Sequence, residues 1–291
     1  MISGAPLTSS TNWITPEPLG HLQATGRDAK GRKQYRYHEA WAEQRSRLKF
    51  GQLRQFGEAL PRIRRRMRAD LKKGLPNEEA ILAAMVMLVD RVHLRVGNRI
   101  YARENKTFGV TSLLKRHLRT EEGDMVTLRF TAKGGEVQEY ELESPALHDI
   151  LEEIADLPGR ELFSWRDEDA GLRRVSSQRL NAYLSEIGGV GVTAKTFRTW
   201  AGSVAGFAEA LGALKRDGAV RVTAVCEAAA AKLHNTPAIC RTSYVHPEVI
   251  ALATESDRVD DAIKAFETAP SISGLNRAEE RFLAFLEIRE G

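Results

Sequence analysis

Residues 234–247 read His-Asn-Thr-Pro-Ala-Ile-Cys-Arg-Thr-Ser-Tyr-Val-His-Pro, and the rest of the chain is organised around them. A helical, alanine-rich run ends where this segment begins. Asn235 and Thr236 are typical helix-capping residues, and Pro237 suits the first turn of a helix. The spacing therefore predicts a short second helix that presents Arg241 and Tyr244 one turn apart on the same side. Tyr244 could then act as a nucleophile, but taken alone it is more typical of a half-buried core tyrosine.

The 291-residue chain has the apolar and charged content of an ordinary globular protein. No apolar run reaches transmembrane length, and the N-terminus lacks the features of a signal peptide. We therefore expect a soluble, cytoplasmic protein with no membrane partner. Cys226 and Cys240 form no CxxC pair and are interpreted as reduced, packed thiols. The histidines show no paired ligand spacing, which argues against a metal site.

Positive charge is concentrated in the first quarter of the chain. Residues 1–75 hold sixteen Lys and Arg against six Asp and Glu, whereas the remainder holds twenty-seven against thirty-three. This asymmetry indicates a polyanionic partner, for which nucleic acid is the leading candidate. A solvated basic helix face would produce the same imbalance.

An aromatic and basic strand is predicted inside this basic region. Tyr35 and Tyr37 alternate so that they share one face, and Arg32 and Lys33 come just before them. Cationic side chains suit phosphate contacts, while Gln34 and the tyrosines suit contacts to base edges. A surface hairpin whose aromatic face packs inward is nearly as typical of this pattern.

The chain is predicted to divide into two domains. A basic, helix-forming segment is broken at residues 72–76, which we interpret as the boundary between a domain of residues 1–75 and a domain of residues 76–291. Asn77 caps a following helix, residues 80–92, that is apolar on most sides and is therefore expected in the core of the second domain.

Two cationic residues of the second domain, Arg95 and Lys133, lie in predicted connecting segments, one after a helix and one in a hairpin turn. Arg95 follows the core helix beside Gly97, where it could point into a cleft or simply stabilise the helix C-terminus. Residues 125–131 and 137–142 are predicted strands of a hairpin. Lys133 lies at the tip of that hairpin, a place from which it could reach into a groove, although exposed lysines are ordinary in turns.

A long helix is predicted from residue 194 to residue 214, capped by Thr193. Lys195 and Arg198 lie together in its opening turns, where positive charge opposes the helix dipole. This local cost indicates that an anion binds between them. Further helices are predicted over residues 145–157, 177–187, 256–268 and 276–287, with a polar loop over residues 160–175.

Taken in order, these motifs resemble the type IB DNA topoisomerases, in particular their compact poxvirus and bacterial branch. The resemblance covers nearly the whole chain from about Thr15. It rests on four motifs: Gly26-Arg-Asp-Ala-Lys-Gly-Arg-Lys-Gln-Tyr-Arg-Tyr37, Leu94-Arg-Val-Gly97, Lys195-Thr-Phe-Arg-Thr-Trp200 and Asn235-Thr-Pro-Ala-Ile-Cys-Arg-Thr-Ser-Tyr244. It implies an α+β protein, with a small N-terminal α/β domain and a mainly α-helical catalytic domain that contains a small antiparallel sheet.

The resemblance also implies a role for each residue of the set. Tyr244 would attack a DNA phosphodiester and form a 3′-phosphotyrosyl link. Arg95 and Arg198 would bind the pentacoordinate phosphorane, and Lys133 would be the general acid for the departing 5′-oxygen. Asn235 occupies a position that is usually histidine in the family, and its amide can still donate to a non-bridging oxygen.

The partner implied by the resemblance is duplex DNA, enclosed by a monomeric clamp in the nucleoid. No ATP is required because the covalent link conserves the energy of the phosphodiester bond, and Mg²⁺ is not obligatory. The family positions that contact DNA correspond to Gln34, Tyr35, Tyr37 and Tyr101, next to the basic residues Arg32 and Lys33, and Lys195 lies in the catalytic motif.

Two other functions remain open on the sequence. Tyrosine recombinases share the catalytic fold but carry a histidine at the place of Lys195, so this lysine favours the topoisomerase. A non-enzymatic basic DNA-binding protein would explain the charge but not the ordered set of site residues. Family members begin with a longer N-terminal stretch, so the resemblance implies a shortened clamp domain here. His234 is interpreted as a structural neighbour and Arg241 as a helper or scaffold.

Overall fold

The computed structural model describes residues 10–29, 31, 33–75, 77–97, 99–121, 123–166 and 171–290. The chain forms two compact units, Met1–Gln52 and Leu53–Gly291. Each unit is described by itself.

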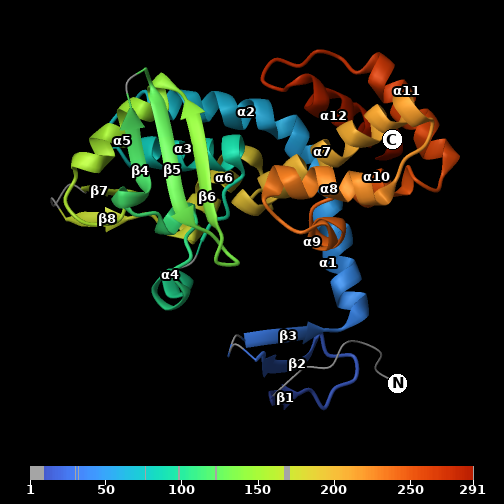
Figure 1. The fold of residues 1–291 in the computed structure, drawn as a ribbon, viewed down its shortest axis with the longest axis horizontal. Helices are drawn as coiled ribbons and strands as arrows, with labels where there is room; N and C mark the ends of the chain where they lie inside the picture. The colour runs from blue at the N-terminus through green and yellow to red at the C-terminus, as the bar shows by residue number, and fades with distance from the viewer. Residues whose placement is uncertain are drawn as a thin grey trace. The chain divides into compact units, whose positions relative to one another are not determined.

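The first unit is a small antiparallel sheet followed by a helix (Figure 1). Strands β1 (Ser10–Ile14), β2 (Leu22–Arg27) and β3 (Lys33–Tyr37) pair in sequence order. β1 was not predicted, whereas β3 matches the expected aromatic strand. Helix α1 (Glu39–Gly51) begins after His38, whose ring accepts a hydrogen bond from the Ala40 N–H at 3.1 Å.

The second unit is mainly helical. In chain order it contains α2 (Leu53–Leu71), α3 (Glu78–Val92), α4 (Arg99–Asn105), η1 (Val110–Ser112), η2 (Lys115–His117), β4 (Leu118–Glu121), β5 (Met125–Thr131), β6 (Val137–Glu143), α5 (Pro145–Asp156), β7 (Ser164–Arg166), β8 (Leu172–Arg174), α6 (Ser177–Gly188), α7 (Ala194–Asp217), α8 (Val222–Leu233), α9 (Pro237–Ser243), α10 (Pro247–Ala251), α11 (Ser256–Thr268) and α12 (Arg277–Glu290). Among the described residues, none of these helices is both long and apolar enough to cross a membrane.

The core of this unit is built around α3. Residues 80–89 are all buried, and Asn77 caps the helix by accepting a hydrogen bond from the Glu79 N–H at 3.0 Å, as predicted. Helices α2, α5, α6 and α7 pack against α3. The apolar face of α2 is buried at Phe56, Leu60 and other positions. α2 therefore belongs to the second unit, and the expected division at residues 75–76 differs from the one at residues 52–53 that packing defines.

A three-stranded antiparallel sheet, in the order β4-β5-β6, forms one end of the unit, and α5 packs against it (Figure 1). The predicted β5–β6 hairpin is present, and Thr131 lies opposite Val137 in it. Two features were missed: β4, and the short β7–β8 pair in the segment that we expected to be a polar loop. Strands of three or four residues are too short to show a period of two.

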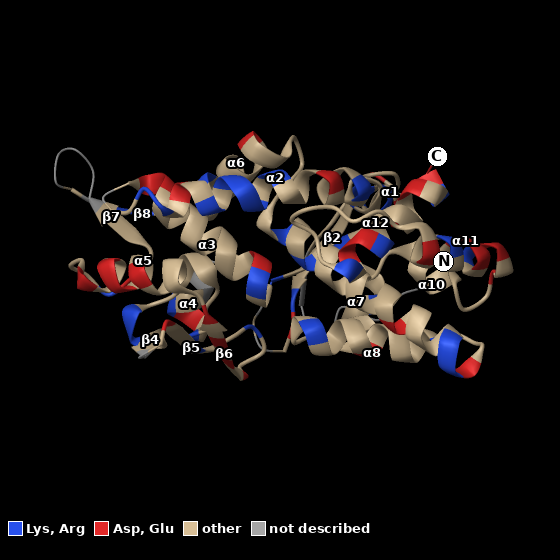
Figure 2. Ribbon diagram, turned by 90° about the horizontal axis from the view of Figure 1, so that it is seen from above, with Lys and Arg blue, Asp and Glu red and all other residues tan. Residues whose placement is uncertain are grey.

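Buried charges link the N-terminal and C-terminal helices of this unit. The Arg64 guanidinium lies 2.8 Å from Asp90 and 2.8 Å from Glu279, and the Trp200 indole donates to Glu279 at 3.2 Å. Despite burial, hydrogen bonding to Arg64 lowers the pKa of Glu279. On the outside, Lys and Arg follow α2, while Asp and Glu gather on α5 and α11 (Figure 2).

Candidate active site

The nucleophile candidate Tyr244 lies directly after α9, not within it. Of the two capping candidates Asn235 and Thr236, it is Thr236 that caps this short helix, by accepting a hydrogen bond from the Ile239 N–H at 3.4 Å. The helix ends at Ser243, and Tyr244 has the non-helical dihedral φ −135°. Tyr244 is half-buried and Arg241, inside the helix, is exposed, so the expectation that the helix itself carries both residues is wrong. The chain must turn here because Pro247 begins α10.

Helix α7 packs against the backbone of Tyr244 and hydrogen-bonds to it. The Ser203 hydroxyl donates to the Tyr244 carbonyl at 3.0 Å and accepts from the His246 N–H at 3.0 Å. Gly202 allows the close approach, because a Cβ there would lie 2.9 Å from the Tyr244 carbonyl oxygen. This packing fixes where the tyrosine ring leaves the backbone.

Arg198 connects the C-termini of two helices beneath that ring. It is only 4% exposed, and it donates to the His93 carbonyl at the end of α3 and, at 3.0 Å, to the Leu233 carbonyl at the end of α8. Helix C-termini have unpaired carbonyls and partial negative charge, which makes a buried cation tolerable there. The Arg198 Cζ atom lies 5.2 Å from the centre of the Tyr244 ring. Its Nε has no hydrogen-bond partner among the described residues, so one donor remains unused.

Arg95 supplies the second cation. Its Nη2 lies 3.4 Å from the His234 carbonyl oxygen, next to the Leu233 carbonyl that Arg198 binds. Burial and the nearby Arg198 guanidinium both lower the pKa of Arg95, while Tyr244 opposes the shift. Two neighbouring guanidinium groups beside a tyrosine concentrate positive charge, which favours the binding of an anion.

Asn235 directly follows Leu233 and His234, whose carbonyls accept hydrogen bonds from Arg198 and Arg95. His234 adopts the left-handed conformation, φ 47°, and the Asn235 N–H donates to the Ala230 carbonyl at 3.1 Å, which closes α8. The half-buried Asn235 side chain accepts from the Thr236 N–H at 3.2 Å. No described residue accepts a hydrogen bond from its amide group.

Lys133 is not brought into contact with this group. It is exposed in the turn between β5 and β6, beside Gly134 at φ 107° and Gly135 at φ 89°. Among the described residues its ammonium makes no hydrogen bond or ion pair. The hairpin turn, α4 and α9 nevertheless lie along the same edge of the second unit (Figure 1).

Tyr140 on β6 is a site residue that our sequence analysis missed. Its ring meets the His234 ring edge-on at a centroid distance of 5.4 Å, and its hydroxyl donates to Gln138 Oε1 at 2.7 Å. Burial raises the pKa of Tyr140, and the charges of Arg198 and Arg95 oppose the shift. The available signal was the predicted strand itself, because its period of two places Gln138 and Tyr140 on one face of the strand that follows the Lys133 turn.

The predicted DNA-contacting strand is exposed in the first unit. Tyr35 and Tyr37 are 51% and 41% exposed and stack with 6.4 Å between ring centres, which rules out an aromatic face packed inward. The Lys33 ammonium lies 5.7 Å from the Tyr35 ring centre, and Gln34 donates to Asp28 at 3.0 Å. Arg32 lies outside the described residues.

Two other predicted contacts belong to the second unit. Tyr101 is on α4, but its side chain is outside the part of the structure that is described. Lys195 is exposed in the first turn of α7, whereas Arg198 is buried one turn further along. We had expected the two cations to lie together, but the structure gives them different environments.

A possible metal-binding cluster lies away from these residues. Asp124, His148 and Asp149 have ligand atoms within 4.8 Å of one another, at the start of β5 and on α5. None of the five predicted catalytic residues belongs to it.

Fold and site together define a class: a mainly helical domain with a small antiparallel sheet that gathers two arginines around a tyrosine. Residues 32–268 match the family model described as the catalytic core of eukaryotic DNA topoisomerase I. This match covers most of the chain, and the chain belongs to that family.

Individual relatives agree with the family match. The chain is 34% identical over 192 residues to DNA topoisomerase 1B of Acanthamoeba polyphaga mimivirus, which covers 65% of this chain and 57% of the relative. It is 28% identical over 178 residues to DNA topoisomerase 1 of Mycosarcoma maydis, covering 54% and 17%. It is 26% identical over 117 residues to DNA topoisomerase 1B of Vaccinia virus (strain Western Reserve), covering 40% and 37%. The chain thus spans less than two thirds of each relative's length.

Proposed function

We propose that this chain is a type IB DNA topoisomerase that relaxes supercoiled duplex DNA by cutting, swivelling and resealing one strand. The observation that carries the proposal is the placement of Tyr244 beside two buried or half-buried arginines, with Arg198 Cζ 5.2 Å from its ring. A tyrosine in the core of a protein has no need of such neighbours, whereas a nucleophile for a phosphodiester does. Family membership supports the same conclusion.

In the proposed reaction the Tyr244 oxygen attacks phosphorus and loses its proton to water. The bond from phosphorus to the 5′-oxygen breaks, and Lys133 gives that oxygen a proton. Arg95 and Arg198 bind the non-bridging oxygens, whose negative charge is greatest in the transition state. Asn235 donates its free amide hydrogen to the same oxygens. Attack by the 5′-hydroxyl then reverses each step and reseals the strand.

Arg198 is buried and Lys133 is exposed, and the two environments suit their different roles in the proposed reaction. Arg198 is fixed by two helix-terminal carbonyls and needs no rearrangement when the phosphate arrives, which lowers the cost of charge stabilisation. Lys133 is exposed on a glycine-flanked turn, so it must approach once DNA is bound. We propose that DNA binding completes the site by bringing this hairpin turn to the 5′-oxygen.

Several companion features belong to the proposal. The protein would act as a monomer that closes around duplex DNA in the bacterial nucleoid, with Tyr35 and Tyr37 contacting bases. It would need no ATP, because the phosphotyrosyl bond conserves the free energy of the broken linkage. Mg²⁺ would not be obligatory, because Arg95 and Arg198 supply the positive charge at the phosphate.

The test is relaxation of negatively and positively supercoiled plasmid in EDTA without ATP. We expect the wild type to relax both and Tyr244→Phe to relax neither while still binding DNA. Relaxation by Tyr244→Phe would contradict the assignment of the nucleophile. Joining of paired target sites without relaxation would show a recombinase, and binding without any strand cleavage by the wild type would show a non-enzymatic DNA-binding protein.

A further inference from the structure

A short strap, residues 108–112, lies between the loop that carries Arg95 and the β5–β6 hairpin. The Phe108 N–H donates to the carbonyl of Thr131, the last residue of β5, at 2.8 Å. The Val110 N–H donates to the Arg95 carbonyl at 2.9 Å. One short stretch of backbone is thus bonded to both segments that carry the proposed catalytic cations.

The strap lies very close to the Arg95 loop, because a glycine of one faces a glycine of the other. A Cβ at Gly109 would lie 2.5 Å from the Arg95 carbonyl oxygen and 2.6 Å from Gly97 Cα. A Cβ at Gly97, where φ is 88°, would lie 2.8 Å from Ser112 Oγ. The Ser112 hydroxyl is engaged as well, because it accepts from the Gly109 N–H at 3.0 Å and donates to the Gly109 carbonyl at 3.1 Å. Contacts this close leave no room for the strap to slide along the Arg95 loop.

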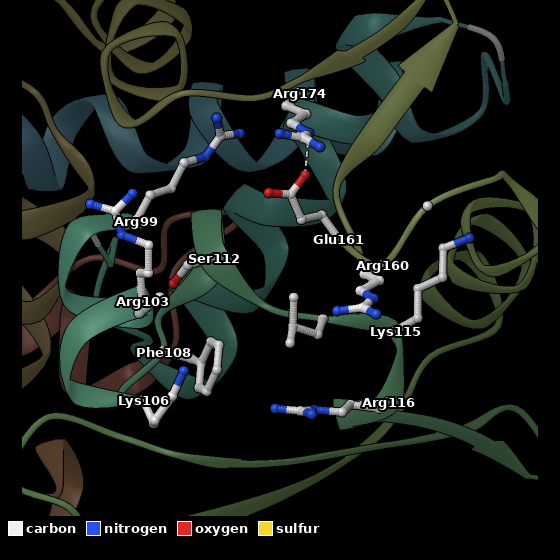
Figure 3. A pocket seen from close by; sticks show the side chains of 13 residues that line it. Arg99, Arg103, Lys106, Phe108, Ser112, Lys115, Arg116, Arg160, Glu161 and Arg174 are labelled. Atoms are coloured by element: carbon white, nitrogen blue, oxygen red, sulfur yellow. Dashed lines mark ion pairs between the residues drawn. The ribbon is translucent and has the colours of Figure 1, made fainter.

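The aromatic ring of Phe108 supports the hairpin from below. It meets the His117 ring edge-on with 4.4 Å between ring centres, and His117 lies 6.1 Å from the Phe130 ring of β5. Burial lowers the pKa of His117 to about 4, so its ring is neutral at neutral pH and suits these apolar contacts. Phe108 and Ser112 also line a hollow of about 1240 Å³, so this side of the strap faces open space rather than packed protein (Figure 3). The place of the strap therefore depends on the Arg95 loop and the hairpin.

Thr131 is the point from which the turn with Lys133 extends. It pairs with Val137 at the end of the hairpin ladder, and its carbonyl is fixed by the Phe108 N–H. Two residues of extended chain span at most about 7 Å, so the Lys133 Cα stays within that distance of the Thr131 Cα. Any displacement of Thr131 is therefore passed on to the lysine.

We propose that the strap is a positioning element of the cleavage reaction, which sets where Lys133 delivers its proton relative to the phosphate bound by Arg95. The inference rests on the proposed function, in which both cations act on the same phosphate. A general acid must come within about 2.6–3.2 Å of the oxygen that it protonates, so two independently moving loops would meet this condition only rarely. The strap joins the two loops into one unit and acts through them.

The test compares two duplexes that differ in the atom that leaves. One has the natural 5′-oxygen at the scissile phosphate, and the other has a 5′-bridging sulfur. When Tyr244 attacks the second duplex, the phosphorus–sulfur bond breaks and sulfur leaves as a thiolate, which needs no proton because thiols are much stronger acids than alcohols. Sulfur therefore rescues a variant whose general acid is misplaced, but not one whose nucleophile or phosphate clamp is misplaced.

The main variant removes a single hydrogen atom donor from the strap. Phe108 is replaced by its α-hydroxy acid analogue, so that an ester oxygen takes the place of the N–H that donates to Thr131. The matched control makes the same exchange at Leu180, whose N–H donates to the Ser176 carbonyl at 3.1 Å in the first turn of α6. Each protein loses one backbone hydrogen bond and keeps its side chain.

For the Phe108 ester we expect single-turnover cleavage of the oxygen duplex to fall at least about tenfold, and cleavage of the sulfur duplex to fall less than about threefold. The Leu180 ester should cleave both duplexes at the wild-type rate. Lys133→Ala should lose about a hundredfold or more on the oxygen duplex and regain most of it on the sulfur duplex. Gly109→Ala should slow both, because it also displaces Arg95, and should slow the oxygen duplex more.

Equal losses on the two duplexes for the Phe108 ester, or no loss on either, would overturn the proposal. So would a failure of sulfur to rescue Lys133→Ala, because Lys133 would then not be the acid whose position the strap sets. A wild type that cleaves neither duplex would refute the proposed function itself, and the inference with it.

Discussion

Gly202 is where α7 comes closest to the backbone of Tyr244, and its replacement by alanine is a sharp test of how the nucleophile is positioned. A Cβ at this position would lie 2.9 Å from the Tyr244 carbonyl oxygen, 3.1 Å from Tyr244 Cβ and 3.0 Å from Leu233 Cδ1. Two of these three atoms sit on or next to the backbone, so they cannot move away by a side-chain rotation. Ordinary contact begins at 3.4 Å, so the Tyr244 carbonyl must retreat by about 0.5 Å.

The expected effect on stability is small because two terms oppose each other. Overpacking of this kind costs about 1–3 kcal/mol, whereas alanine is better than glycine inside a helix by about 1 kcal/mol. Cleavage should suffer more, since a displacement of about 1 Å of a reacting group can slow a reaction about a hundredfold. For Gly202→Ala we expect the cleavage rate to fall at least about tenfold, with a net destabilisation of about 0–2 kcal/mol.

The assay is single-turnover formation of the covalent adduct at saturating DNA, together with thermal unfolding. Gly212→Ala is the matched control, because it makes the same change in the same helix. A Cβ at 212 would meet only the end of the flexible Arg216 side chain, 2.9 Å from Nη1. Equal cleavage rates for Gly202→Ala and Gly212→Ala, with both proteins folded, would refute the positioning argument.

Three further predictions concern the site, its pH dependence and the division of the chain. Tyr140→Leu loses the ring contact to His234 and should lower the rate of adduct formation about tenfold. Tyr140→Phe keeps the ring and should retain most of the wild-type rate. Equal losses of rate in the two variants would show that the hydroxyl matters instead. Burial lowers the pKa of His93 to about 4 from 6.5, so the unfolded chain takes up the proton first as pH falls, and about 3 kcal/mol of stability should be lost between pH 6.5 and pH 4. Urea unfolding across this range should show a shallower loss in His93→Asn, which tolerates the left-handed φ of 54°, and an unchanged loss would contradict the assignment. A chain that begins at Leu53 should fold and form adduct, whereas one that begins at Asn77 should not fold, because it lacks the buried face of α2; cooperative unfolding of the shorter chain would contradict this.

Local chemistry explains which parts of the fold could be predicted. Asn77, Thr193 and Thr236 mark helix starts by side-chain caps, and the Lys133 turn lies between two strands of clear alternation. Such signals act over four or five residues and need no knowledge of the partner surface.

Features that depend on distant partners could not be predicted in the same way. The position of α2 follows from its packing against α3, α6 and α7, which the basic sequence of α2 does not reveal. Arg198 was found through its motif, but its attachment to two helix C-termini appears only in the folded chain.

The central claim is that Tyr244 forms the covalent bond to DNA. The most direct measurement is to trap the protein on a nicked or suicide duplex, digest it and identify the modified peptide by mass spectrometry. We predict that the residue Tyr244 carries the DNA through a 3′-phosphate and that Tyr244→Phe gives no adduct. An adduct on any other residue, or one joined to a 5′-phosphate, would contradict the claim.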